Sequence, residues 1–69
     1  MADQEMVGKI GRMTGEASHD RLGEVMIPVR GGVEAFNAYS SDPEKRLTRG
    51  MRVVVIEYLP PRTVVVAPM

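Results

Sequence analysis

The sequence predicts an all-β domain, a small barrel of five strands, and three observations support this prediction. Valine occurs ten times in 69 residues, and β-branched side chains fit a pleated, half-buried surface better than a helix. Seven glycines and five prolines divide the chain into segments of strand length. Leucine occurs only three times, which disfavours a helical bundle.

Glycine and proline separate the apolar runs of the N-terminal half. Two glycines within the first run, Gly8 and Gly11, indicate a bulge or a sharp bend. Pro28 cannot donate to a strand ladder, so it marks an edge, a bulge or the end of the second strand. Gly31 and Gly32 predict the turn into the third strand. The five strands are expected near residues 6–14, 21–29, 33–40, 51–59 and 63–67.

The C-terminal half contains the clearest strand signal. Residues 40–50 are polar, with Leu47 as their one expected anchor to the core, and a short helical turn fits this segment. The apolar run 51–59 ends at two prolines, and residues 60–62 are short enough for a hairpin connection. The last two strands are therefore expected to be antiparallel neighbours.

Closure into a barrel is expected because a flat five-stranded sheet would leave one apolar face uncovered and two edges open. An OB-type barrel fits the strand count. An SH3-like barrel fits it too, because counting strands does not determine their order. One inward phase across the strands predicts a buried core made of Ile10, Val25, Phe36, Val53, Val55, Val64 and Val66.

Length and charge restrict the class of protein. The chain is long enough for one domain, expected over residues 6–68 after a disordered segment at 1–5. It has no cysteine, which excludes disulfides and thiolate metal sites. Nine basic residues balance nine acidic ones, which argues against strong non-specific binding of nucleic acid. No apolar run approaches the roughly 20 residues that span a bilayer.

The sequence contains no convincing catalytic motif. His19 is the only histidine, so no histidine pair can bind a metal. Asp42 and Glu44 are followed at once by Lys45 and Arg46, a pattern typical of a solvated charged loop. There is no glycine-rich phosphate loop and no nucleophile elbow. We therefore expect no enzymatic activity, no cofactor and no metal.

Nucleic-acid binding is the alternative that the sequence leaves open. Single strands bind to barrels through a basic groove and stacked aromatic side chains. The chain has three aromatic residues, Phe36, Tyr39 and Tyr58, and seven arginines. Each expected strand carries about as many acids as bases, so we expect weak binding or none.

The fourth and fifth expected strands indicate an interaction surface. Residues 53–56 and 64–66 are apolar on both faces, whereas a barrel strand has one face inside and one outside. An exposed aliphatic patch on a small domain often marks an interaction site, unless loops cover it. The residues predicted to form this surface are Tyr39, Val54, Ile56, Tyr58 and Val65.

Three stretches of the chain resemble the C-terminal soluble domain of the NfeD family, especially its actinobacterial forms. They are residues 7–12, residues 22–25 with 34–39, and residues 49–58 with 63–66. The resemblance covers residues 6–68 and depends on structural glycines and alternating valines. It implies a five-stranded OB-fold barrel.

The resemblance also implies a membrane context. In the family this domain usually follows transmembrane helices, longer members carry a serine-protease domain upstream, and the proteins are associated with stomatin- and flotillin-like membrane proteins. No catalytic residue of the family belongs to this domain. We therefore expect a non-enzymatic interaction domain of a bacterial membrane protein, with stomatin- or flotillin-like partners or a second copy. As part of a longer protein it would be membrane-associated, and as a stand-alone chain soluble.

Overall fold

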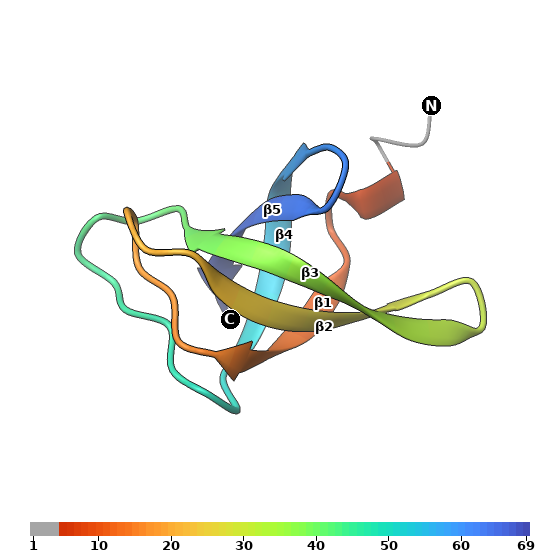
Figure 1. Cartoon of the computed structure of the whole chain (residues 1–69), viewed down its shortest axis with the longest axis horizontal. Coiled ribbons are helices and arrows are strands. Elements are labelled where there is room, and N and C mark those ends of the chain that lie inside the picture. Colours follow the sequence, from red (N-terminus) through yellow and green to blue (C-terminus); the bar gives the residue numbers. More distant parts are fainter. Residues whose placement is uncertain (1–4) are drawn as a thin grey trace.

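The computed structural model describes residues 5–69, which form a closed all-β barrel (Figure 1). The five predicted strands are confirmed, and the largest shift is at the first, which begins four residues later than expected. Residues 5–8 make a helical turn instead, in which the Lys9 amide donates to the Met6 carbonyl at 3.1 Å. The N-terminal segment is predicted to be disordered, and its residues 1–4 lie outside the described residues. The strands are β1 (Ile10–Gly15), β2 (Gly23–Val29), β3 (Gly32–Ser40), β4 (Arg52–Leu59) and β5 (Thr63–Pro68).

Strand order distinguishes the two barrel types that the sequence left open. The order is β1-β2-β3-β5-β4, and β4 pairs with β1 to close the barrel. All neighbours are antiparallel except β3 and β5, which are parallel because the chain returns through β4 between them. A five-stranded Greek-key barrel of this order is the OB-type fold.

Two tight hairpins were predicted and both are present. The turn between β2 and β3 consists of Arg30 and Gly31, with φ of 41° and 80°. Two positive φ angles make a type I′ turn, whose twist matches that of the flanking strands. The turn is one residue earlier than predicted. The β4–β5 connection at residues 60–62 makes these strands antiparallel neighbours, as expected.

The barrel interior is filled by alternate residues of all five strands. Six of the seven predicted core residues are buried: Val25, Phe36, Val53, Val55, Val64 and Val66. Leu47 is fully buried and confirms the predicted anchor of the polar loop. The remaining core residues are Met6, Met13, Ala17, Ile27 and Ala38.

The prediction that Ile10 is buried was wrong, because a glycine occupies the inward position beside it. Ile10 is 42% exposed on the outside of β1, whereas Gly11 is buried. A Cβ on Gly11 would lie 2.7 Å from the Met26 carbonyl oxygen and 2.8 Å from a methyl of Val25. The backbones of β1 and β2 approach so closely that only glycine fits inside, and this fixes the phase of β1.

The end of the barrel formed by residues 16–22 and 41–51 is closed by backbone hydrogen bonds. Ala17 and Leu47 exchange N–H to carbonyl bonds of 2.9 and 2.8 Å, and the Ser40 amide donates to the Ser18 carbonyl at 3.1 Å. Where a short helical turn was expected, this loop has one hydrogen-bonded turn and no helix: the Lys45 amide donates to the Asp42 carbonyl at 3.0 Å. A carboxylate oxygen of Asp42 also accepts the Glu44 amide at 2.9 Å.

Candidate functional site

Strand registers bring most of the predicted interaction residues together on the outside of the barrel. Val54 lies between Ile10 of β1 and Ala67 of β5. On the same face Val65 is the neighbour of Tyr39 on β3. Because paired residues share a face of the sheet, these side chains form one continuous surface.

This surface remains partly open to solvent. Ile56 is 47% exposed, while Val54, Val65 and Tyr39 are half-buried. Together with His19, two serines and Glu57, which pairs with Val65, the residues Tyr39, Ile56 and Val65 line a shallow hollow. We call the set Ile10, Tyr39, Val54, Ile56, Val65 and Ala67 the outer apolar face.

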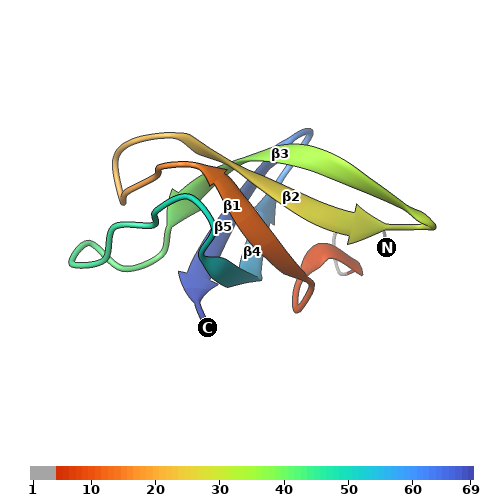
Figure 2. The same cartoon turned by 90° about the horizontal axis from the view of Figure 1, so that it is seen from below.

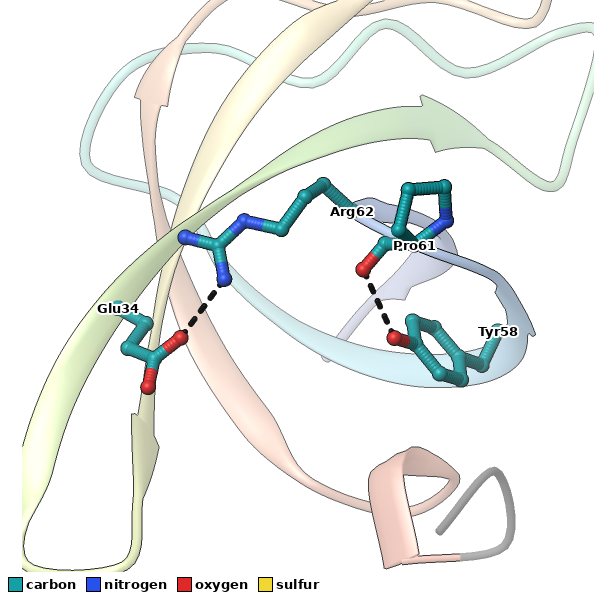
Figure 3. Close-up of polar contacts among 4 residues, drawn as sticks. All are labelled: Glu34, Tyr58, Pro61 and Arg62. Atoms are coloured by element: carbon teal, nitrogen blue, oxygen red, sulfur yellow. Dashed lines mark hydrogen bonds and ion pairs between the residues drawn. The ribbon is translucent and has the colours of Figure 1, made fainter.

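A β-bulge in β4 separates Tyr58 from the outer apolar face. The register shifts between Val55 and Glu57, which leaves Ile56 as an extra residue and reverses the alternation that follows. Tyr58 therefore pairs with the buried Val64 and packs against the core. Its hydroxyl donates to the Pro61 carbonyl at 2.8 Å (Figure 3). The structure thus places four of the five predicted site residues on one face and Tyr58 elsewhere.

Tyr58 belongs to a second hollow, at the barrel end opposite the Leu47 loop, which the sequence did not predict. Side chains of β2, β3, β4 and the β4–β5 turn converge there. They do so because of the register between these strands and the β-bulge in β4. The Arg62 guanidinium lies 4.9 Å from the centre of the Phe36 ring. It also donates to Glu34 at 2.8 Å (Figure 3). We call this hollow the barrel mouth. It is lined by Glu5, Met6, Lys9, Val29, Arg30, Glu34, Phe36, Tyr58, Pro61 and Arg62.

The residues weighed for catalysis remain dispersed. His19 is exposed in a loop, and Asp42 uses a carboxylate oxygen to bond the backbone of its own turn. Within residues 5–69 no three histidine, cysteine or acidic side chains are grouped to hold a metal ion. In the same part of the chain, no helix has the length and apolar character needed to cross a membrane.

The three aromatic residues do not form one stacking platform. Tyr39 lies on the outer apolar face, whereas Phe36 and Tyr58 line the barrel mouth. Phe36 is only 6% exposed and is covered by the Arg62 guanidinium. The two half-buried tyrosines therefore lie on separate parts of the surface and the phenylalanine ring is covered, which does not favour the nucleic-acid alternative.

Comparison with known proteins identifies close structural neighbours. The family model described as NfeD C-terminal domain matches residues 10–67. The soluble domain of the NfeD protein YuaF from Bacillus subtilis is 26% identical and superposes with a TM-score of 0.80. That match covers 93% of this chain and 74% of the other. No curated protein sequence matches the chain significantly.

Two further solved structures share the fold. The C-terminal domain of stomatin operon partner protein 1510-C from Pyrococcus horikoshii is 25% identical, with a TM-score of 0.74, over 97% of this chain and 92% of that one. A soluble domain from Corynebacterium glutamicum has a TM-score of 0.69 over 91% and 90% of the two chains. It comes from a membrane protein implicated in regulation of membrane protease activity, and its 21% identity supports the fold alone.

Proposed function

Because the chain belongs to the NfeD C-terminal domain family, we propose that it is a non-enzymatic interaction domain of an NfeD-like membrane protein. The outer apolar face is proposed to dock a protein partner at the membrane. The family assignment is consistent with a soluble domain of a membrane-associated protein, and the similar YuaF structure is likewise the soluble domain of an NfeD protein.

The observation that carries this proposal is the exposed aliphatic surface over β1, β4, β5 and β3. Ile10 and Ile56 remain 42% and 47% exposed although each has an apolar neighbour on the same face. A surface of this kind gains free energy when a partner removes it from water, at about 25 cal/mol per Å² of apolar area. The backbone does not require these residues to be apolar, because outward positions of a barrel strand are free to be polar.

The proposed partners are stomatin- or flotillin-like membrane proteins, with a second copy of the domain as the alternative. The name of the Pyrococcus horikoshii relative, a stomatin operon partner protein, supports the first choice. Tethering to a membrane raises the effective concentration of both partners, so a weak contact through a small surface is sufficient. In solution the isolated domain is then expected to be monomeric or weakly dimeric.

A matched pair of exposed residues provides the test. Ile56 on the outer apolar face and Leu22 outside it are 47% and 46% exposed. A photo-crosslinking amino acid at position 56 of the full-length protein in its native membrane should yield adducts with a stomatin- or flotillin-like protein. The same group at position 22 should not. Equal adduct yields at the two positions, or none at position 56, would contradict the proposal.

A further inference from the structure

The hairpin of β2 and β3 extends beyond the rest of the barrel (Figures 1 and 2). β2 and β3 pair from Gly23 and Ala38 as far as Val29 and Gly32. β5 reaches β3 only at Asn37, so within residues 5–69 the segment 32–36 of β3 pairs with β2 alone. In this part of the chain, a free strand edge therefore lies beside the barrel mouth.

The direction of the backbone groups along this edge follows from hydrogen bonds further along β3. The amides of Asn37 and Ser41 donate toward β5, to the carbonyls of Arg62 and Val66, at 2.8 and 2.9 Å. Alternate residues of a strand point to the same side, so Val33 and Ala35 point there too. β5 does not extend to them, and among residues 5–69 their backbone groups meet no strand partner. Within that range, two N–H donors and two carbonyl acceptors in a row thus have no strand partner.

The opposite edge of the same ribbon is blocked by a proline. Pro28 pairs with Val33 across the hairpin, at a position whose backbone points away from β3. β1 pairs with β2 only as far as Met26, so no described strand pairs with this edge beyond that residue. Proline has no N–H to donate, which is a common device against strand addition. Only the β3 edge is therefore competent to extend the sheet.

Side chains beside the open edge supply a binding pocket for alternate residues of an added strand. Glu34 and Phe36 both point from β3 into the barrel mouth, whose apolar floor is completed by Met6, Val29 and Tyr58. Three cationic side chains surround it, and two of them pair with Glu5 and Glu34. The third, Lys9, forms no ion pair with any residue in the range 5–69. The barrel mouth therefore suits an added strand in which one inward-pointing side chain is apolar and the next inward-pointing side chain, two positions away, is acidic.

A second copy of the chain fits this edge poorly. Symmetric antiparallel pairing that uses all four free groups would set Val33 opposite Ala35 of the other copy. Glu34 would then face its own equivalent in a non-hydrogen-bonded pair, where side chains are closest. Like charges in that position are destabilising.

We propose that the β3 edge from Gly32 to Phe36 binds an extended segment of a partner protein by β-strand addition. Backbone hydrogen bonds to Val33 and Ala35 hold the segment, and a bulky apolar residue with an acidic residue two positions away enters the barrel mouth. This site is separate from the outer apolar face, and it does not require that face to have a partner.

The test uses a blocked peptide whose sequence is Thr-Val-Glu-Val-Phe-Val-Thr and the ¹⁵N-labelled domain. Addition of the peptide should shift the amide resonances of Val33 and Ala35 more than those of the outer apolar face. Two N-methylated peptides then test the strand geometry, one methylated at odd and one at even residues. Because only one set of amides faces the domain, one peptide should bind at least tenfold more weakly and the other nearly as the parent.

Two variants of the domain locate the contact. Val33→Pro removes one edge donor at a position where its partner across the hairpin is already proline, and it should weaken the parent peptide at least tenfold. Ile56→Lys on the outer apolar face should leave peptide binding unchanged. No shift with the parent peptide, equal weakening by both methylation patterns, or loss of binding in Ile56→Lys alone would each overturn the proposal. Because the methylated peptides act on the unmodified domain, the test holds even if Val33→Pro fails to fold.

Discussion

The two ends of the barrel differ in how completely their backbone groups are hydrogen-bonded and in how completely side chains fill the interior. At the end formed by residues 16–22 and 41–51, Ala17 and Leu47 exchange backbone hydrogen bonds and both side chains are buried. At the barrel mouth, Val33 and Ala35 extend past β5 and the interior opens into a hollow. The contrast suggests that one end contributes mainly to stability and the other is available for binding.

The chemistry of the side chains follows the same division. Leu47 is 0% exposed and plugs the closed end without any polar partner. Phe36 at the mouth is covered instead by Arg62, whose own side chain is 53% exposed. A guanidinium that covers a ring from the solvent side can move away at little cost, whereas a buried leucine cannot. Substitutions at the two ends should therefore differ strongly in their effect on stability.

The largest effect is expected from Leu47→Ala. Loss of a fully buried leucine side chain leaves a cavity and should lower the free energy of unfolding by about 2–5 kcal/mol. Leu22→Ala is the matched control, because Leu22 is 46% exposed, and it should change stability by less than about 0.5 kcal/mol. Urea unfolding followed by circular dichroism measures both. Similar midpoints for the two variants would mean that the closed end is not a structural plug.

An intermediate effect is expected from Gly11→Ala, where β1 crosses β2 at the start of the projecting hairpin. The new methyl would meet the Met26 carbonyl oxygen at 2.7 Å, and a backbone atom cannot move aside without shifting its strand. Overpacking of this kind should cost about 1–3 kcal/mol. Gly32→Ala is the control, since its methyl would meet only one atom, at 3.9 Å. An unfolding midpoint for Gly11→Ala equal to that of Gly32→Ala would contradict the proposed close approach.

The smallest effect is expected from Arg62→Ala at the barrel mouth. The substitution removes the contact with the Phe36 ring and the ion pair with Glu34, both at the solvent boundary. Each contact of this kind contributes at most about 1 kcal/mol, and the ion pair is further screened by water and salt. Thermal unfolding should show a loss well below that of Leu47→Ala. A loss as large as that of Leu47→Ala would show that the mouth is part of the stabilising core.

Much of this fold could be predicted from the sequence because local signals agreed with one another. The two prolines before Arg62 and the valine runs on either side fixed the β4–β5 hairpin, and Leu47 stood out as the only large apolar side chain in a polar loop. Ile10 was misplaced because an apolar residue is expected inside. The backbone distance between β1 and β2, which requires Gly11 inside, depends on tertiary packing.

The residues of the candidate surfaces also differ in whether the sequence could predict their positions. Val54, Ile56 and Val65 could be assigned to an outer face because residues 53–56 and 64–66 are apolar at every position. Tyr58 could not be placed, since a single extra residue at Ile56 reverses the side to which it points. The free edge of β3 has no sequence signature either. It arises because β5 begins opposite Asn37, and that register is set by the whole barrel.

Amide hydrogen exchange along β3 tests the central claim of an open edge most directly. Glu34 and Phe36 point toward β2 and should be protected, whereas Val33 and Ala35 should exchange roughly tenfold faster or more because their N–H groups face solvent. Asn37, whose amide donates to the Arg62 carbonyl at 2.8 Å, should mark where protection on that side resumes. Alternating fast and slow exchange from Val33 to Phe36, followed by protection at Asn37, is the predicted result. Uniform protection along the segment would contradict it, because the edge would then already have a partner.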